Sequence, residues 1–453
     1  MTSPVDCAQI KCDVSRYKQV LNNVPQWEHI GLIKRVVGLT IEASGPQASI
    51  GDTCFIQSQK PGGHTCVTMA EVVGFRDNRI LMMPLGELSG IAPGARVTSA
   101  RRPLGVPVGK ELIGRVINAM GEPIDGLGPI MASDERPVTS RPPSPLMRQG
   151  ITQPLSVGIR AIDTLITCGK GQRMAIMSGS GVGKSTLLGM MARNTAADIN
   201  VIGLIGERGR EVREFLERDL GSSGLARSVV VVATSDEPPL IRVRGALVAT
   251  TLAEYFRDKG SDVLLMMDSL TRFAMAQREV GLAVGEPPTT RGYTPSVFSM
   301  LPRLLERAGN AEKGTITGFY TVLVEGDDFN EPVADAVRSI VDGHIVLNRN
   351  LAEHNHYPAI DVLASVSRLM NQITASDHQA TAGWLRDLLA TYRDAEDLVN
   401  IGAYKRGSNA RIDQALDMIE PIRTYLQQGI AEDCTWEHGM SALLALADQQ
   451  EVV

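Results

Sequence analysis

The sequence predicts an α/β protein: a core built on a parallel sheet, preceded by a small N-terminal β-barrel and followed by a helical C-terminal domain. Three observations predict it. Short β-branched runs alternate with helical stretches between about residues 150 and 350, which is typical of a parallel sheet covered by helices. Before them, residues 31–98 carry short alternating stretches broken by Gly and Pro. After about Ser376, leucines recur at helical spacing with few strand signals.

Four regions are predicted in order, a docking segment, the barrel, the α/β core and the helical domain, at residues 1–25, 26–100, 101–370 and 371–453. The first contains apolar side chains that share one face of a short helix: Tyr17, Val20, Leu21 and Val24. The Pro-rich stretch 136–145 is expected to be an extended connector, because proline fits neither a helix interior nor a central strand. Core strands are predicted at Arg173–Met177, Val201–Ile205, Val229–Val232, Val263–Met267, Ile316–Val324 and Ile345–Leu347.

Composition restricts the possible classes of protein. With 453 residues, 45 basic against 51 acidic side chains and a formal net charge of -6, the chain has no global attraction for nucleic acid or anionic lipid. The six cysteines lack metal-site spacing and are expected to be reduced thiols. No apolar run is long enough to span a bilayer, so a cytoplasmic protein is expected, with peripheral docking at a membrane still open.

A glycine-rich loop stands between a predicted strand and a predicted helix at 187–193. Three glycines let backbone N–H groups face a phosphate, the helix N-terminus favours negative charge, Lys184 reaches the β- and γ-phosphates, and the Ser185 hydroxyl coordinates Mg²⁺. Ser178 occupies the position of the motif's first glycine. This pattern predicts a P-loop NTPase core that binds Mg·ATP through Ser178, Gly179, Ser180, Gly181, Val182, Gly183, Lys184, Ser185 and Thr186.

Two carboxylates follow predicted strands of the same sheet. Asp268 ends the apolar run Val-Leu-Leu-Met-Met and is expected to hold the Mg²⁺ shell, because ligands of open α/β sheets bind at the strand C-termini. Glu207 ends another strand and is the candidate base that orients the attacking water. Glu211 lies one helical turn further on, so either glutamate could act if the helix begins early.

Several longer motifs resemble the rotary ATPase family, and within it the type III secretion ATPases, above all those of flagellar export. These motifs are Gly206-Glu-Arg-Gly-Arg-Glu-Val212, Asp236-Glu-Pro-Pro, Met267-Asp-Ser-Leu-Thr-Arg272, Gly285-Glu-Pro-Pro-Thr-Thr-Arg-Gly-Tyr293, Leu301-Pro-Arg-Leu-Leu-Glu-Arg307 and Tyr357-Pro-Ala-Ile-Asp361. The resemblance as a whole covers the chain from about Gly31 to the last helices.

The resemblance implies a homohexameric ring with active sites between subunits. It gives Glu207 the role of the catalytic glutamate, Arg208 a contact with the γ-phosphate, and Glu211 a magnesium-bound water. It also implies that Tyr357 stacks on adenine and that Arg368 reaches the γ-phosphate held by a neighbouring subunit. From the residue pattern alone, Arg368 would be an ordinary arginine on a helix surface.

Partners are implied by the same resemblance. The turn-rich stretch 281–293 is long for a connector, is expected to be exposed, and would face a central stalk protein. The N-terminal segment would bind a stator protein. Export substrates, their chaperones and a membrane export gate, met peripherally at the cytoplasmic face of the inner membrane, complete the expected set, and no nucleic acid is expected.

Alternatives stay open at this point. An injection apparatus uses ATPases with the same motifs. A rotary synthase subunit is a second alternative, although the acidic run typical of synthase catalytic subunits is replaced after Gly402 by Ala-Tyr-Lys-Arg-Gly-Ser. A Rho-like RNA translocase would need exposed aromatics in the barrel, where residues 31–98 contain only Phe55 and Phe75.

Two further polar clusters have simpler interpretations. His354 and His356 lack evident third and fourth metal ligands and are expected to have a surface or packing role. The stretch Glu325-Gly-Asp-Asp328 is expected to be a polar loop after a strand.

Overall fold

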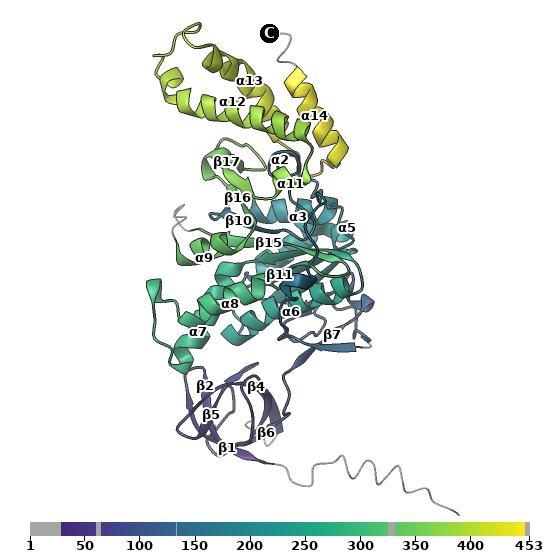
Figure 1. The fold of residues 1–453 in the computed structure, drawn as a ribbon. Helices are drawn as coiled ribbons and strands as arrows, with labels where there is room; N and C mark the ends of the chain where they lie inside the picture. The colour runs from purple at the N-terminus through teal and green to yellow at the C-terminus, as the bar shows by residue number, and fades with distance from the viewer. Residues whose placement is uncertain (1–28, 60–64, 133, 325–330, 449–453) are drawn as a thin grey trace, which may run out of the picture. The chain divides into compact units, whose positions relative to one another are not determined.

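A computed structural model describes residues 29–59, 65–132, 134–324 and 331–448 (Figure 1). The chain divides into two compact units, Met1–Pro103 and Leu104–Val453. The predicted fold class is confirmed: a β-barrel, an α/β core with a parallel sheet and a set of C-terminal helices. The predicted docking segment 1–25 and the stretch 325–328 lie outside the described residues.

The first unit is a closed barrel in the strand order β1-β2-β5-β4-β3-β6. Its interior is apolar because alternate side chains of each strand point inward, among them Ile33, Ile56 and Met82. The hairpin between β4 and β5 turns at Asp77 and Asn78, whose φ angles are 47° and 58°, a geometry that matches the twist of the flanking strands. The strands are β1 Gly31–Val37, β2 Thr40–Ser44, β3 Thr53–Gln59, β4 Thr65–Arg76, β5 Arg79–Pro84 and β6 Arg96–Ser99.

The second unit contains a sheet in the order β17-β16-β10-β15-β13-β11-β12-β8. Adjacent strands of this sheet are parallel from β16 to β8. Strand β17 is antiparallel to β16, and the short β14 is antiparallel to β15. All the predicted core strands are present, because buried β-branched runs specify strands covered on both faces. They are β8 Val116–Asn118, β10 Arg173–Ser178, β11 Ile199–Ile205, β12 Ser228–Ala233, β13 Asp262–Asp268, β14 Gly309–Asn310, β15 Thr315–Leu323, β16 Gly343–Leu347 and β17 Ile360–Ser367.

Helices connect these strands and cover the sheet, with α6 packed on β11, β12 and β13. One connection contains a π-helical turn, η3, directly after α4 and against α3. The helices are α2 Arg160–Leu165, α3 Lys184–Asn194, α4 Gly209–Glu214, η3 Phe215–Leu220, α5 Gly221–Leu225, α6 Pro239–Asp258, α7 Leu270–Val284, α8 Pro295–Leu305, α9 Pro332–Ile340, α10 Arg349–Glu353 and α11 Met370–Ile373. Short 3-10 turns lie at Lys110–Leu112, Pro145–Met147 and Thr290–Gly292.

The C-terminal helices α12 Ser376–Asn400, α13 Ala410–Leu426 and α14 Trp436–Asp448 belong to the second unit and lie together beyond β17 and α2 (Figure 1). Their apolar faces join the core of the α/β part: Leu385, Ile422 and Leu443 are buried in the same cluster as Ile162 and Leu188. The helical part is therefore packed onto the α/β part through a shared apolar core.

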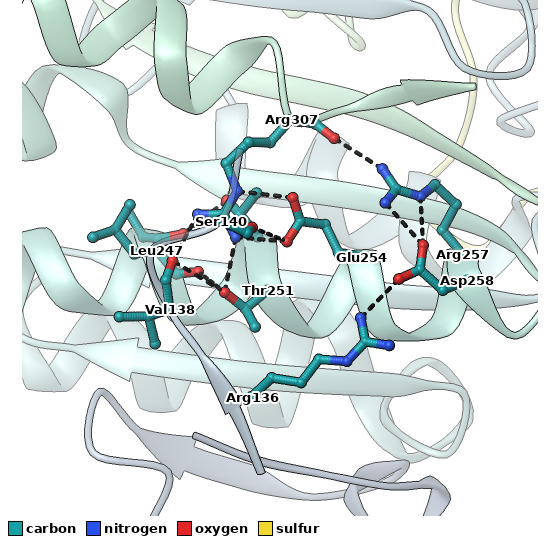
Figure 2. Close-up of polar contacts among 11 residues, drawn as sticks. Arg136, Val138, Ser140, Leu247, Thr251, Glu254, Arg257, Asp258 and Arg307 are labelled. Carbon is teal, nitrogen blue, oxygen red and sulfur yellow. Dashed lines mark hydrogen bonds and ion pairs between the residues drawn. The ribbon is translucent and has the colours of Figure 1, made fainter. Parts of the chain in front are cut away.

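The connector around residues 134–140 is fixed to α6 by an ionic network whose central pair, Arg307 and Glu254, is buried (Figure 2). The Arg307 guanidinium donates to both carboxylate oxygens of Glu254, at 2.9 and 2.7 Å, and to the Val138 carbonyl at 2.9 Å. Ser140 donates to Glu254 at 2.6 Å, and Arg136 donates to Asp258 at 2.8 Å. Arg136 belongs to the strand β9 Asp134–Pro137, which pairs with β7 Gly105–Val108 in a separate two-stranded sheet, so the predicted connector begins as a strand.

Two simpler expectations can also be compared with the described residues. Cys54, Cys66, Cys168 and Cys434 are free thiols, as expected. Within the described ranges, every helix is too short or too polar to cross a membrane.

Candidate active site

The loop 178–186 joins β10 to α3 at the C-terminal edge of the parallel strands. Gly181 and Gly183 have φ angles of 78° and 88°, a region that favours glycine, and Gly183 is the N-cap of α3. Ser178 is the last residue of β10 and has no positive φ, which explains why serine is accepted at the motif's first position. The loop thus presents a helix N-terminus and free backbone N–H groups to an anion.

Lys184 contacts two carboxylates from neighbouring strands. Its Nζ lies 2.5 Å from Asp268 Oδ1 and 3.5 Å from Glu207 Oε1. Asp268 ends β13 and Glu207 follows β11, and these strands are paired with Leu204 opposite Asp268, so both side chains emerge at the same edge. Thr321 of β15 donates to Asp268 Oδ1 at 2.7 Å and fixes the carboxylate.

The electrostatics of this cluster follow from its burial. The side chains of Lys184, Glu207 and Asp268 are 13%, 15% and 5% exposed. Burial and the Asp268 charge raise the pKa of Glu207 to about 7, against the opposing effect of Lys184. For Lys184, burial lowers the pKa, but the charges of Asp268 and Glu207 outweigh it and raise that pKa above its ordinary value. The cluster is thus a cation held between two acids, one of which can exchange a proton near neutrality.

Arg208 and Glu211 lie at the mouth of the cluster. Their side chains are 79% and 45% exposed, and Arg208 Nη1 lies 3.6 Å from Glu211 Oε1. The helix α4 begins at Gly209, so Glu207 precedes it and Glu211 stands in its first turn. Glu207 is therefore the glutamate beside Lys184, and Glu211 faces outward next to it.

Tyr357 packs against the phosphate loop of its own chain. Its ring is close enough that a Cβ added at Gly183 would lie 3.4 Å from ring atoms Cδ1 and Cε1. The side chain stays 39% exposed, which leaves an aromatic face accessible beside the loop. Tyr357 comes from the segment between α10 and β17, more than 170 positions after the loop it contacts.

Arg368 lies at the opposite edge of the sheet. It follows β17, where Ser367 is opposite Gly343, whereas Ser178 of the phosphate loop is aligned with Leu347 at the other end of β16. Four strand residues separate these levels, on the order of 13 Å. Arg368 is exposed and donates to the Arg338 carbonyl at 3.2 Å, so its interpretation as a helix-surface arginine is wrong and it is not brought to its own chain's loop.

The stretch 281–293 is only partly a loop. The helix α7 continues to Val284, because its apolar spacing outweighs the glycine at Gly281, whose added Cβ would meet Thr294 at 2.5 Å. From Gly285 to Arg291 the chain is mostly exposed. The expected exposed loop is therefore shorter than predicted and begins at Gly285.

A cavity of about 620 Å³ lies away from the phosphate loop, between the segment from α10 to β17 and the helices α12 and α13. Its lining includes His354, His356, Tyr392 and Arg423. Burial lowers the pKa of His356, and within the described residues no cluster of three or more His, Cys, Asp or Glu side chains could hold a metal ion. The interpretation of the two histidines as packing or surface residues agrees with this setting.

Sequence reasoning missed contacts that join distant segments. Thr321 holds Asp268, Arg349 reaches the Ser180 carbonyl at 3.5 Å, and Thr186 donates to Asp219 at 3.2 Å. None of these contacts belongs to a local motif, although Thr186 itself lies in the predicted loop. The alignment of β15 with β13 is the one signal that could have indicated Thr321, because it ends beside Asp268 at the same edge.

Comparison with known proteins follows the same division of the chain. Family models match residues 33–100 as the β-barrel domain of the ATP synthase alpha/beta family, 158–367 as its nucleotide-binding domain, and 374–445 as the C-terminal domain of the type III secretion ATPase EscN. The chain is similar to a flagellum-specific ATP synthase of Bacillus subtilis, 53% identical over 99% of both chains. It is also 53% identical to a type 3 secretion system ATPase of Xanthomonas euvesicatoria, over 92% of this chain and 94% of that one. The solved structure of the assembled ATPase EscN from enteropathogenic E. coli superposes with a TM-score of 0.85 at 45% identity, covering 92% of this chain and 99% of the other.

Proposed function

The chain belongs to the ATP synthase alpha/beta family and, within it, to the ATP-hydrolysing flagellar and type III secretion ATPases; on that premise we propose that it powers flagellar protein export as a homohexameric ring. The observation that carries the catalytic part is the cluster of Lys184, Glu207 and Asp268 beside the phosphate loop. In this mechanism the loop residues 179–186 bind the phosphates through backbone N–H groups, and Lys184 turns from its carboxylates to the β- and γ-phosphates.

The oxygen donors at this edge fit Mg²⁺. Ser185 offers a hydroxyl and Asp268 a carboxylate held by Thr321, which are the hard oxygen ligands that Mg²⁺ prefers, with phosphate oxygens and water filling the remaining positions. When bound, the ion would neutralise charge that develops on the transferred phosphoryl group. In this proposal Glu211 orients a water of that shell and Arg208 contacts the γ-phosphate; the exposure of both side chains beside the cluster supports these roles.

Glu207 acts as the general base. Its carboxylate accepts a proton from the attacking water, and a pKa near the working pH suits that role because the group is then partly ionised and still basic. The partial burial that raises the pKa also keeps bulk water away from the carboxylate. Before the nucleotide binds, Lys184 compensates the negative charge of Glu207 and Asp268.

The proposed site is completed by a second copy of the chain. Arg368 lies at the sheet edge opposite its own phosphate loop, which supports a role on a nucleotide bound by an adjacent subunit. An arginine supplied in this way stabilises negative charge in the transition state. Tyr357, packed on Gly183, is proposed to stack on the adenine of the nucleotide in its own subunit.

The partners proposed for this ring follow from the relatives. A solved EscN structure is described in complex with its central stalk EscO, with 45% identity to this chain and a TM-score of 0.84. We assign a stalk protein to the exposed part of 281–293 and a stator protein to the N-terminal segment. Export substrates, chaperones and a membrane export gate are the further proposed partners, placing the ring in the cytoplasm at the inner face of the membrane.

The test is ATP hydrolysis by the purified chain as a function of its concentration, with Glu207→Gln as the blank. Specific activity that rises with concentration and vanishes in the variant is expected for sites completed between identical copies. Negligible activity at every concentration, with ATP binding intact, would instead indicate a subunit that needs a different chain. Restoring motility to a strain that lacks its flagellar export ATPase, and failing to restore an injection apparatus, would establish the flagellar assignment.

A further inference from the structure

The connection between α13 and α14 contacts Tyr357, beside the phosphate loop, through Gln428. Its backbone N–H donates to the Tyr357 carbonyl at 3.0 Å. Its side chain is buried, with 5% of the residue exposed, although it is polar and close to the protein surface. The neighbouring Gln427 is exposed.

Every polar group of the Gln428 side chain has a partner. Nε2 donates to the Gly158 carbonyl at 2.8 Å and to the Glu432 carbonyl at 3.2 Å, and Oε1 accepts from the Arg160 backbone N–H at 2.8 Å. A buried amide with both ends paired holds one orientation, since turning it would leave donors facing donors. Gln428 is thus fixed from two segments at once.

The segment that receives Gln428 is itself tightly seated. The Gly158 N–H donates to Asp163 at 3.1 Å, and its φ of 72° favours glycine. A Cβ added at Gly158 would lie 2.3 Å from the Cβ of Asn194, the last residue of α3. A continuous set of contacts therefore runs from the helix that begins at the phosphate loop, through Gly158 and Gln428, to Tyr357.

Arg160 and Arg193 hold the rest of the connection between α13 and α14. Arg160 donates to the carbonyls of Tyr425 and Gln427 at 2.8 and 3.0 Å and pairs with Glu432, and Arg193 donates to the Ile430 carbonyl at 2.7 Å. The 620 Å³ cavity separates α12 and α13 from the segment between α10 and β17 elsewhere. The hydrogen bonds that attach this connection to the α/β part therefore lie close to Tyr357.

We propose that Gln428 is a positioning residue for the purine base: it holds the backbone of Tyr357 so that the ring stands against Gly183 and offers its free face to the base. This inference rests on the proposed role of Tyr357. Gln428 does not touch the nucleotide in this arrangement; it acts by fixing the aromatic ring before the nucleotide arrives, which spares the ordering that binding would otherwise require. It also ties the C-terminal helices to the base pocket.

The test compares ATP with inorganic tripolyphosphate, which has the phosphates but no base. Both are titrated calorimetrically into the full chain carrying Glu207→Gln, so that ATP is not consumed. Gln428→Leu, which keeps the approximate size but removes the amide, is expected to raise the Kd for ATP roughly fivefold, the size expected for a lost buried hydrogen bond. The Kd for tripolyphosphate should stay within about 1.5-fold, because the loop 178–186 is untouched. In chains with Glu207 intact, the KM for ATP should rise while kcat changes less than about twofold.

Three controls separate this role from general damage. Gln427→Ala should change neither ligand's Kd. Tyr357→Ala should weaken ATP about tenfold or more, as expected for loss of a stacking ring, and in that background Gln428→Leu should have no further effect. If Gln428→Leu does not fold, Gln428→Glu, which keeps the acceptor for Arg160 and loses both donors, takes its place with the same expectation.

The measured affinities distinguish failure of the positioning role of Gln428 from failure of the proposed role of Tyr357. An equal loss of affinity for ATP and tripolyphosphate would mean that Gln428 supports the fold generally and overturns the positioning role. Weaker ATP binding in Tyr357→Ala, with none in Gln428→Leu, overturns the positioning role alone. Unchanged ATP binding in both variants would overturn the assignment of Tyr357 to the base as well.

Discussion

Lys184 stands between the two acids that it must leave when a nucleotide binds, with its Nζ 2.5 Å from Asp268 and 3.5 Å from Glu207. All three side chains are largely buried, so the ammonium compensates a charge that would otherwise be costly in this environment. The first phosphate to enter the loop competes with Asp268 for the lysine. Binding of ATP and release of the Asp268 carboxylate are thus linked events in the proposed mechanism.

Glu207→Gln should abolish hydrolysis without abolishing binding. The amide cannot accept a proton from water, and loss of a general base costs about 10²- to 10⁴-fold in rate. The measurement is steady-state ATP turnover beside calorimetric ATP binding. Glu217→Gln, an exposed glutamate paired with Arg213, is the matched control and should keep full turnover. Residual turnover above one tenth in Glu207→Gln would assign the base elsewhere, first of all to Glu211.

Arg368→Ala should reduce hydrolysis by about 10³-fold or more, the effect of losing an arginine that stabilises the transition state. The sharper measurement mixes two inactive chains, Arg368→Ala and Glu207→Gln. Some interfaces in the mixed rings pair an intact Glu207 with an intact Arg368, so activity should reappear on mixing. Arg338→Ala, a nearby half-buried arginine whose carbonyl accepts from Arg368, serves as the control. Mixtures that stay inactive would place Arg368 outside the intersubunit site.

Gly183→Ala should weaken nucleotide binding. Its φ of 88° is unfavourable for alanine, and the added methyl carbon would lie 3.4 Å from the Tyr357 ring. Gly383 in α12 is the comparison, because an added Cβ there meets nothing within 4 Å, and alanine should stabilise that helix by about 0.5–1 kcal/mol. Calorimetric ATP binding and thermal unfolding measure the two effects. Equal ATP affinity in both variants would contradict the role of Gly183 geometry.

Arg307→Leu should destabilise the second unit by about 3–5 kcal/mol, because it leaves Glu254 ionised and buried without its partner (Figure 2). Arg136→Ala removes an ion pair in the same network, but Arg136 and Asp258 are 33% and 39% exposed, so its cost should stay below about 1 kcal/mol. Urea unfolding followed by circular dichroism gives both values. Similar midpoints for the two variants would mean that the buried pair adds no more than the exposed one.

Asp163 should make stability depend on pH. Burial raises the pKa of this carboxyl to about 7, although Ser156, Val157 and Gly158 donate to it. The folded pKa lies above the unfolded value near 4, so the unfolded state gives up its proton first. The stability contributed by Asp163 is therefore complete below about pH 4 and is lost as the pH rises to about 7.

A carboxyl pKa of about 7 in the folded state, against about 4 in the unfolded state, corresponds to a loss of about 4 kcal/mol across that range. The measurement is the difference in unfolding free energy between the wild type and Asp163→Asn at pH 4.5, 6 and 8. A difference that shrinks as the pH rises is expected, since the asparagine does not titrate. A constant difference would show that the three donors keep Asp163 ionised throughout.

The strands and the phosphate loop could be predicted because their signals are local. A buried parallel strand such as β12 is a continuous β-branched run, and the loop 178–186 has its glycines, lysine and serine within nine positions. Glu207 and Asp268 could be placed at one edge because both follow such strands.

Other features depend on contacts that sequence spacing does not contain. Gln428 meets Gly158 and Tyr357 across 270 and 71 positions, and neither contact leaves a pattern in the neighbouring residues. The end of α7 was misjudged for a different reason, since Gly281 looks like a turn residue but is needed for close packing against Thr294. The residue pattern alone does not place Arg368 directly after a strand, where the structure has it, following β17.

The position of Arg368 also has a consequence for when ATP would be hydrolysed in a cell. In the proposed mechanism a single copy binds a nucleotide with its own loop, whereas Arg368, the arginine proposed to speed hydrolysis, lies at the far edge of the same sheet. A reserve of unassembled copies would therefore hold ATP without consuming it, and turnover would begin only where copies meet. The export site, not the amount of protein made, would then set the energy demand of the system.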